Sequence, residues 1–561
     1  MLACGAALGV AACAVAAAPV WADDDGPETP YGAYLAARWA DALQSPEDAA
    51  RYYSEALERD PGNAMLVSEA FHAALLAADW DLTVELGEAV LESDPANAEA
   101  RLALAADAMG KGEWRRATRL LDQAQMGPLD NIVGSVLLAW SRAGAGDEEG
   151  ALAALARPDE AALFSALVGL HQAMLLDRAG DPSAETSLQT AMDAYALPGF
   201  AAREYGRFLE RRDRAEAARE IYLQRLMENP DDRMVRAELA RLDAGDNAPR
   251  MPAADAASLA LYGAAAALMG RDFSDRAQTY LILAVRLDGE FSPARMLLGE
   301  IMIGQGRLEQ AEEMFRAAID DPAVGVEARI RLAQIEAARG ETAAAEEMLR
   351  ALWEDDGTED SARALADALR ATEKWDEAEA LLTQLLDARA ASGQGADWRL
   401  LYGRAVTRER QDNWPQAEED FRAAIALNPD DPTLLNYLGY AMVDRGKNLD
   451  EGFELIRRAV ALAPREGFII DSLGWAYYRL GEYDEAVTNL ERAAALAPGQ
   501  ADINDHLGDA YWRVGRELEA RFQWQRALTL EPEPDLRSAI ETKLAAGLPP
   551  AGEAPALAEN K

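Results

Sequence analysis

The chain has 561 residues, half of them hydrophobic, and its 98 acidic and 55 basic residues give a formal net charge of −43. This length is too great for one hydrophobic core, and the absence of strand-like alternation of Val, Ile and Thr indicates an all-helical protein. The charge would repel nucleic acid phosphates and anionic lipids, so basic proteins are the better candidate partners, unless the acidic residues only keep an alanine-rich chain soluble.

The first 22 residues differ from the rest of the chain. The run from Leu2 to Ala22 carries no charge and ends in Val20-Trp21-Ala22 before three aspartates. The residues at −3 and −1 fit a signal peptidase cut between Ala22 and Asp23, so we predict a signal peptide over residues 1–22 and a periplasmic mature chain. Two alternatives stay open. A lipobox-like run ending at Cys13 would give an outer-membrane lipoprotein with membrane contact through that lipid, and an uncleaved anchor is the other.

Cysteine usage follows from this prediction. The chain has two cysteines, Cys4 and Cys13, and both lie before the expected cut. The mature chain would therefore have no disulfide, no thiolate metal site and no cysteine nucleophile. A chain without thiols suits an oxidising compartment such as the periplasm.

From residue 30 onward the sequence repeats with a period of about 34 residues. When the recurring proline is counted as position 32, small residues recur at positions 8, 20 and 27 and large ones at 4, 7, 11 and 24. Small residues let two helices cross closely, large ones fill the gaps, and proline ends the second helix. The residues that define the period most clearly are Ala49, Tyr53, Ala56, Pro61 and Pro95 in the first part, and Pro429, Pro464, Pro498 and Pro532 in the last. This is the tetratricopeptide repeat pattern, which predicts an all-α right-handed solenoid of helix-turn-helix repeats.

In chain order, we expect an N-terminal array of degenerate repeats over residues 30–242, a middle array over 253–390 and a C-terminal array over 397–548. Residues 243–252 and 391–397 separate them, because both combine loop-forming residues without an apolar period. Between 131 and 198 the helical periodicity has no clean register, which indicates degenerate repeats or an insertion. A last helix over 536–548 would cover the final repeat. The tail, 549–561, is predicted to be disordered.

The search for catalytic chemistry finds no candidate. The three histidines, His72, His171 and His506, each stand alone in their repeat, without the spacing of a zinc site or a triad. His506 has aspartates on neighbouring turns, but a solvated acidic face is the simpler interpretation. The run 355–360 lacks the ligand pattern of an EF-hand and is interpreted as a turn between hairpins. We predict no catalytic residue, no metal and no cofactor, and hence no enzyme.

The repeat register predicts which side chains face the concave groove. The first helix of each unit lines this groove through positions 2, 5, 9, 12 and 13. In the C-terminal array the candidates for protein binding are Asn436, Tyr440, Asp444, Phe468, Asp471, Trp475, Tyr478, Arg479, Asp502, Asp505, Asp509, Trp512 and Arg513. Aromatic residues flanked by Asp and Arg resemble an interface hot spot, and the alternative is that Trp475 and Tyr478 pack between adjacent helices. The aspartates would repel a C-terminal carboxylate, which argues against that class of peptide ligand.

The same part of the chain resembles a known family. The runs 436–440, 471–481 and 504–512 are similar to bacterial envelope tetratricopeptide repeat proteins. Among these are the outer-membrane lipoprotein adaptors that bind a carboxyl-terminal processing protease and help it degrade peptidoglycan hydrolases. The resemblance covers roughly the last 120 residues closely, and it implies an envelope adaptor whose partners are such a protease or envelope assembly factors.

We therefore expect a secreted, non-enzymatic scaffold that brings envelope proteins together, for example a protease and its substrates. A hypothesis of another class is a structural factor in envelope biogenesis, such as polysaccharide or outer-membrane assembly. A third is a cytoplasmic repeat protein whose N-terminus has been misread. Co-purifying partners would separate the first two hypotheses, and the mature N-terminus would test the third.

Overall fold

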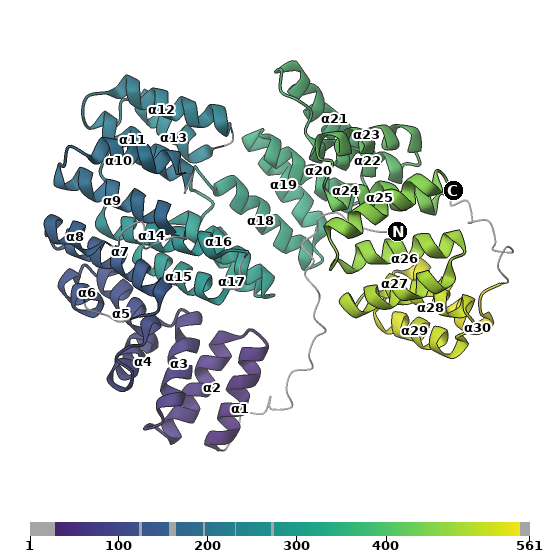
Figure 1. The fold of residues 1–561 in the computed structure, drawn as a ribbon, viewed down its shortest axis with the longest axis horizontal. Helices are drawn as coiled ribbons and strands as arrows, with labels where there is room; N and C mark the ends of the chain where they lie inside the picture. Colours follow the sequence, from purple (N-terminus) through teal and green to yellow (C-terminus); the bar gives the residue numbers. More distant parts are fainter. Residues whose placement is uncertain are drawn as a thin grey trace. The chain divides into compact units, whose positions relative to one another are not determined.

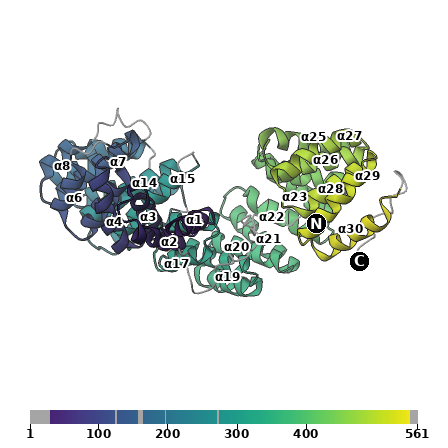
Figure 2. The same cartoon turned by 90° about the horizontal axis from the view of Figure 1, so that it is seen from below.

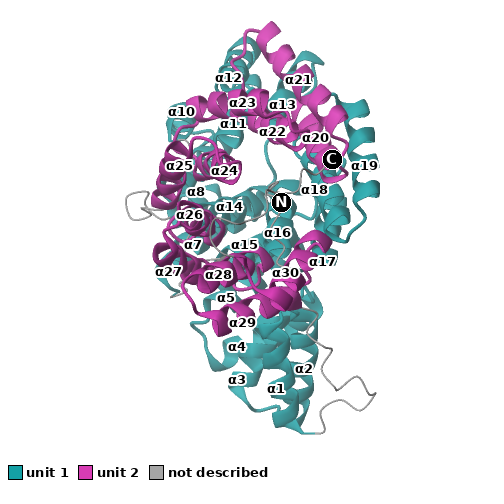
Figure 3. Ribbon diagram, turned by 90° about the vertical axis from the view of Figure 1, so that its right-hand side faces the viewer, with its two compact units in different colours: residues 1–357 teal, residues 358–561 magenta. Residues whose placement is uncertain are grey.

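The computed structural model describes residues 29–549 except 123–125, 156–163, 195–196, 231 and 271–273. The predicted signal peptide, its cleavage site at Ala22 and Asp23, Cys13 and the tail from residue 550 lie outside these residues. The described part consists of thirty α-helices joined by turns and loops, without a strand (Figure 1), so the predicted all-helical repeat fold is confirmed. The chain divides into two compact units, residues 1–357 (unit 1) and 358–561 (unit 2) (Figure 3).

Unit 1 contains nineteen helices within its described residues. Their bounds are α1 Pro30–Ala42, α2 Pro46–Arg59, α3 Ala64–Leu76, α4 Trp80–Ser93, α5 Ala98–Gly110, α6 Trp114–Leu121, α7 Pro128–Gly144, α8 Glu148–Ala154, α9 Ser165–Ala179, α10 Ala184–Asp193, α11 Pro198–Glu210, α12 Ala215–Glu228, α13 Arg233–Asp243, α14 Ala253–Leu268, α15 Ser274–Leu287, α16 Ser292–Gly304, α17 Leu308–Arg316, α18 Gly325–Ala338 and α19 Thr342–Asp356.

Unit 2 contains the remaining eleven helices, whose pairs follow one another in chain order (Figure 2). Their bounds are α20 Glu359–Ala371, α21 Trp375–Ala391, α22 Trp398–Arg410, α23 Trp414–Leu427, α24 Pro432–Asp444, α25 Leu449–Leu462, α26 Gly467–Leu480, α27 Tyr483–Leu496, α28 Ala501–Arg513, α29 Glu517–Thr529 and α30 Pro534–Ala546.

Successive helices pack as antiparallel pairs, in which we call the first the A helix and the second the B helix. In unit 2 the pairs run from α20–α21 to α28–α29, and α30 follows the last B helix. The small residue at position 8 is needed for this packing. A Cβ atom on Gly508 of α28 would lie 2.5 Å from the ring of Trp524 in α29, and one on Gly299 of α16 would lie 2.7 Å from Phe315 in α17. The small residue expected at a close helix crossing, position 8, thus packs in the structure against the large residue at position 24.

Neighbouring repeats of unit 2 are also joined by a recurring polar contact. Arg458, near the end of B helix α25, donates to the carbonyl oxygen of Pro429 at 3.1 Å, and Arg526 of α29 donates to that of Pro498 at 3.2 Å. Arg492 of α27 makes the same contact with Pro464. The proline ends one B helix and leaves its carbonyl free, and the arginine of the next B helix satisfies it.

In unit 1 the chain turns back onto its own first array. After α13, the helices α14 and α15 pack on A helices of that array: α14 on α7 and α9, and α15 on α3 and α5. Two buried carboxylates of the A helices bind the hairpin. Asp107 of α5 accepts from Arg286 at 2.6 Å, and Asp130 of α7 accepts from Tyr280 at 2.8 Å and from Arg276. The A-helix face of the first array is thus occupied by a hairpin of the same chain.

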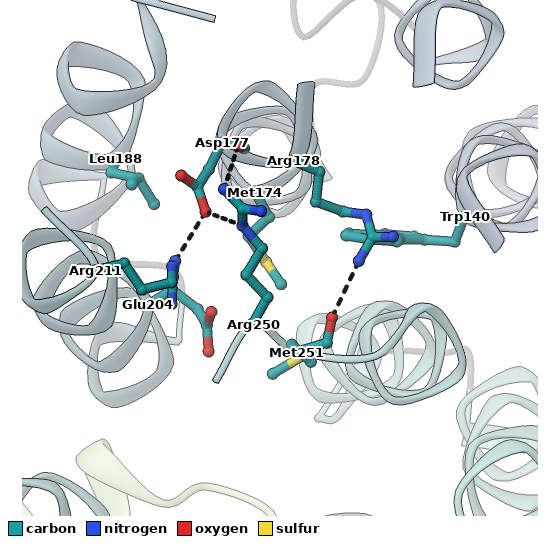
Figure 4. A pocket seen from close by; sticks show the side chains of 9 residues that line it. All are labelled: Trp140, Met174, Asp177, Arg178, Leu188, Glu204, Arg211, Arg250 and Met251. Atoms are coloured by element: carbon teal, nitrogen blue, oxygen red, sulfur yellow. Dashed lines mark hydrogen bonds and ion pairs between the residues drawn. The ribbon is translucent and has the colours of Figure 1, made fainter. Parts of the chain in front are cut away.

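The loop before this hairpin is fixed as well (Figure 4). Asp177 of α9 accepts hydrogen bonds from Arg250 in the loop at 3.2 Å and from Arg211 of α11 at 2.8 Å, and Arg178 donates to the carbonyl of Met251 at 3.5 Å. The division between the two units falls at residue 357, inside the predicted middle array and in the turn expected at 355–360. The division into three arrays stays a prediction.

Candidate protein-binding groove

The thirteen candidate groove residues lie on three consecutive A helices of unit 2. α24 carries Asn436, Tyr440 and Asp444; α26 carries Phe468, Asp471, Trp475, Tyr478 and Arg479; α28 carries Asp502, Asp505, Asp509, Trp512 and Arg513. α26 packs against both α24 and α28, so these side chains belong to one continuous surface. We call it the A-helix face of unit 2.

Several of the candidates are engaged in contacts between neighbouring A helices. Arg479 donates to the carbonyl oxygen of Asp444 at 3.0 Å and forms an ion pair with its carboxylate at 3.4 Å. Arg513 donates to the hydroxyl of Tyr478 at 3.1 Å. Burial, together with the negative charge of Asp509, raises the pKa of Tyr478. Each contact joins residues that are 35 positions apart, which is one repeat plus one residue.

A third contact of this spacing joins Asp471 of α26 to His506 of α28. Nδ1 of His506 lies 3.0 Å from both carboxylate oxygens of the buried Asp471. Burial alone would lower the pKa of His506, but the charges of Asp471, Asp505 and Asp502 outweigh it and raise the pKa to about 9. His506 is therefore a cation at neutral pH and neutralises the carboxylate of Asp471.

Asp505 and Asp509 are buried and bind a lysine of the last helix. Nζ of Lys543 in α30 lies 2.7 Å from Asp505 and 2.8 Å from Asp509, and Nε1 of Trp524 donates to Asp509 at 2.9 Å. Burial and the charge of Asp509 raise the pKa of Asp505 to about 6, while Lys543 opposes the shift. These two aspartates hold α30 in place, so they present little free charge to a ligand. The sequence pattern did not single out Lys543.

Trp512 lies beneath the end of the same helix. Its ring is 5.5 Å from that of Trp524, and Leu544 and Leu548 belong to the same apolar cluster. A Cβ atom on Gly547 would lie 2.1 Å from the Trp512 ring, which shows how closely the chain crosses it. The structure therefore places Trp512 in packing between helices.

Trp475 is only partly buried and lies in a stack of rings. Its ring centre is 4.8 Å from that of Tyr478, nearly parallel, and 4.3 Å from that of His506. Within the described residues, its Nε1 has no hydrogen-bond partner, and neither has Oδ1 of Asn436. Both atoms are buried, so they are unpaired groups beneath this face and are not exposed on it.

Five candidates remain available after these contacts are assigned, and we call them the open groove residues: Asn436, Tyr440, Phe468, Trp475 and Asp502. Phe468 and Asp502 are exposed, and Tyr440 is partly buried. Burial and the nearby charges of Asp444, Asp471 and Asp502 raise the pKa of the Tyr440 hydroxyl. The surroundings are therefore negative, which favours a ligand that is cationic and has apolar parts.

Two hollows of unit 1 differ in character from this face. The larger measures about 550 Å³ and is lined by Trp114, Arg115, Arg116 and Arg119 among others. The cavity beside Asp177 in unit 1 (Figure 4) measures about 10 Å³, which is room for about one water molecule. Within the described ranges, no group of three or more His, Cys, Asp or Glu side chains could hold a metal ion. None of the described helices has both the length and the apolar content to cross a bilayer.

Family comparisons agree with the repeat geometry. A family model described as TPR repeat matches residues 474–515, and models described as tetratricopeptide repeat match 296–358, 361–394 and 405–466. These parts of the chain, between residues 296 and 515, are tetratricopeptide repeats. A TPR repeat-containing protein of Pseudomonas aeruginosa is 41% identical over 90 residues, which are 16% of this chain and 15% of that protein. The match thus spans a small part of that relative's length.

Three solved structures resemble this chain in part, each with a TM-score below 0.5. A tetratricopeptide repeat protein of Parabacteroides merdae is 17% identical with a TM-score of 0.36, covering 45% of this chain and 97% of that one. The Cut9–Hcn1 hetero-tetramer of the APC/C is 15% identical with a TM-score of 0.41, covering 85% and 95%. YrrB, a TPR protein with an unusual peptide-binding site, is 18% identical with a TM-score of 0.27, covering 35% and 99%.

Proposed function

We propose that this protein is an adaptor of the bacterial envelope that binds a partner protein on the A-helix face of unit 2 and brings a protease to its substrates. The repeat fold itself is a protein–protein interaction scaffold. The envelope location is proposed from the uncharged run before Asp23, and the protease link from the resemblance of residues 436–512 to envelope adaptors. Because repeat scaffolds of this fold serve many functions, the partner is proposed from the sequence resemblance and from the chemistry of the face.

The observation that carries the binding site is the contrast between the A-helix faces of the two units. In unit 1, the face of the first array is covered by α14 and α15, and the carboxylates of Asp107 and Asp130 already bind Arg286, Tyr280 and Arg276. In unit 2, Phe468 and Asp502 of the corresponding face are exposed, and Tyr440 and Trp475 are partly buried. The open groove residues are therefore the part of the A-helix faces on which we place the partner.

The chemistry of these residues indicates the kind of partner. An arginine or lysine side chain could pair with the exposed carboxylate of Asp502 and lie over the exposed ring of Phe468, where a cation near an aromatic ring contributes about 0.5–1 kcal/mol. Phe468 and Tyr440 would contact apolar side chains of the same segment. We propose a partner segment that carries basic and apolar residues side by side.

Crosslinking in intact cell envelopes, followed by mass spectrometry, tests this proposal. A photo-reactive amino acid at position 468 should capture a partner, and capture should fall at least tenfold when Trp475→Ala and Asp502→Asn are combined. Asp430→Asn, at an exposed aspartate outside the groove, is the matched control and should capture as well as the unchanged chain. Equal capture by the Trp475→Ala, Asp502→Asn variant would rule out this binding site.

Export is tested separately. If Val20-Trp21-Ala22 is the cleavage site, the intact mass of the protein from cells should correspond to a chain that begins at Asp23. A mass that corresponds to Met1, or to a lipidated Cys13, would contradict this prediction. Neither result would bear on the groove.

A further inference from the structure

The first helix of the chain's described part has an inverted distribution of side chains. α1 buries three alanines, Ala33, Ala37 and Ala40, against the rest of unit 1. Its large apolar residues point outward: Tyr31 is 70% exposed, Leu35 50%, Trp39 54% and Leu43 46%. Helices of soluble proteins normally bury their large apolar side chains, and the terminal repeat of a solenoid normally has a polar outer face.

The outward face of α1 has no unsatisfied charge to keep it in water. The helix carries one basic and one acidic residue, Arg38 and Asp41, whose charges cancel. Asp41 accepts a hydrogen bond from the hydroxyl of Tyr53 in α2 at 2.6 Å. This neutral surface contrasts with the net charge of −43 on the whole chain.

The four exposed residues form one row, in which Leu43 is the first residue after the helix. They follow one another at intervals of four positions, so each lies about 40° further around the helix axis than the one before, over a length of about 18 Å. An aromatic side chain contributes roughly 200 Å², so the row exposes roughly 400 Å² of apolar surface. Two such rows in contact would bury about 800 Å², which lies between crystal contacts and weak specific interfaces.

We propose that α1 pairs with α1 of a second copy of this chain in an antiparallel arrangement. The order of the row is aromatic, leucine, aromatic, leucine. A two-fold axis between Leu35 and Trp39 would place Tyr31 beside Leu43 of the second copy and Leu35 beside Trp39 of the second copy. Each aromatic ring then meets a leucine, so the row is complementary to itself.

The charge of the chain determines the strength of this dimer. Two copies with a net charge of −43 repel each other, and contact at a neutral helix keeps the acidic surfaces apart. Salt screens the repulsion without weakening the apolar contact. The dimer is therefore weak, reversible and tighter at high salt.

Sedimentation analysis of the protein purified from cells tests the dimer. Between 1 and 100 µM protein (on the order of typical weak affinities), the weight-average mass should rise toward twice that of one chain, more so at high salt. Leu35→Glu should abolish this rise without changing helicity. Leu223→Glu on α12 replaces a leucine that is 46% exposed and is the matched control, which should dimerise normally.

Cysteine crosslinking tests the antiparallel register. Cys4 and Cys13 lie in the predicted signal peptide, so introduced cysteines are the only thiols of the processed chain. A mixture of Leu35→Cys and Trp39→Cys chains should form a mixed disulfide dimer in at least tenfold excess over either chain alone. A monomer at 100 µM, or a dimer that persists in Leu35→Glu, would overturn the proposal. So would a monomer that floats with phosphatidylethanolamine–phosphatidylglycerol vesicles through Leu35, because a lipid surface would then be the occupant.

Discussion

Trp475 and Trp512, both predicted to face the groove, differ in their surroundings. The surroundings determine whether each side chain packs between helices or is available for binding. Trp512 lies under α30 beside Trp524, Leu544 and Gly547. The ring of Trp475 stacks with those of Tyr478 and His506, and its buried Nε1 is unpaired within the described residues. The same residue type thus serves packing in one repeat and is left available for binding in the preceding one.

We expect Trp512→Ala to destabilise unit 2 by about 3 kcal/mol, because truncation of a packed aromatic leaves a cavity. Trp475→Ala should cost less stability, about 1–2 kcal/mol, and should reduce partner capture by roughly 30-fold. Denaturant melts and crosslinking yields on both variants measure these effects. Equal losses of stability in the two variants would indicate that Trp475 is also a packing residue.

At the scale of the helix, α30 is held by one buried cation. Burial would lower the pKa of Lys543, but Asp509 and Asp505 outweigh it and raise that pKa. Without Lys543, the two buried aspartates would repel each other, and they would keep only the more distant charge of His506, which acts on Asp505.

Lys543→Met should therefore destabilise unit 2 by about 3–5 kcal/mol at neutral pH. Protonation of the aspartates relieves their repulsion, so the loss should shrink as the pH falls from 7 to 5. Denaturant melts at both pH values measure this. Adding Asp505→Asn and Asp509→Asn should restore most of the stability. A loss that is independent of pH would contradict the proposed role of Lys543.

The arginine contacts between B helices allow a second test at this scale. Arg492→Met together with Arg526→Met leaves the carbonyls of Pro464 and Pro498 without these partners and should cost about 1 kcal/mol in all. The melting temperature should fall by a few degrees. Arg457→Met removes a pair with Glu454 in the same helix and is the control, for which we expect no measurable change. If the control and the double variant melt alike, these contacts do not join the repeats.

For the whole molecule, the period of the sequence predicted the fold because each repeat contacts its neighbours by the same rules. The pairing of Gly508 with Trp524 could be read from their positions, 8 and 24. The return of α14 and α15 onto the first array could not be predicted, because Asp107 and Arg286 are 179 positions apart and no local period links them. The division of the groove residues could not be predicted either. The same side of an A helix faces the proposed binding surface and the next A helix, so the repeat position alone does not say which of the two a side chain contacts.

The division of the groove residues illustrates this limit. Asp471 and Asp502 lie on the same side of adjacent A helices, yet Asp471 binds His506 and Asp502 is exposed. The spacing of 35 places His506 next to Asp471, but it also places Arg537 at 35 positions from Asp502, so the spacing alone does not separate the two aspartates. A search for opposite charges at that spacing would also have found Asp444 and Arg479.

The two units differ in how pH acts on a buried histidine. In unit 1, His171 is fully buried, accepts a hydrogen bond from Nε1 of Trp140 at 3.0 Å, and burial lowers its pKa to about 3. In unit 2, the surrounding carboxylates raise the pKa of His506 to about 9. An unfolded histidine has a pKa of about 6.5.

The signs of the two effects are opposite. Below about pH 6.5, His171 binds a proton in the unfolded form of unit 1 but stays neutral in the folded form. The free energy of unfolding of unit 1 therefore falls by about 1.4 kcal/mol per pH unit, or about 2 kcal/mol by pH 5. His506 binds its proton more tightly when folded, so its contribution is complete below pH 6.5 and is lost as the pH rises through about 9, on the order of 3 kcal/mol.

Calorimetry between pH 5 and 9 should therefore resolve two transitions that move in opposite directions, one for each unit. Acid should lower the transition of unit 1 and alkali that of unit 2. His171→Gln should flatten the acid dependence alone, and His506→Gln the alkaline dependence alone, which separates these histidines from the many exposed carboxylates. A single transition whose pH dependence is unchanged in both variants would mean that neither histidine controls stability.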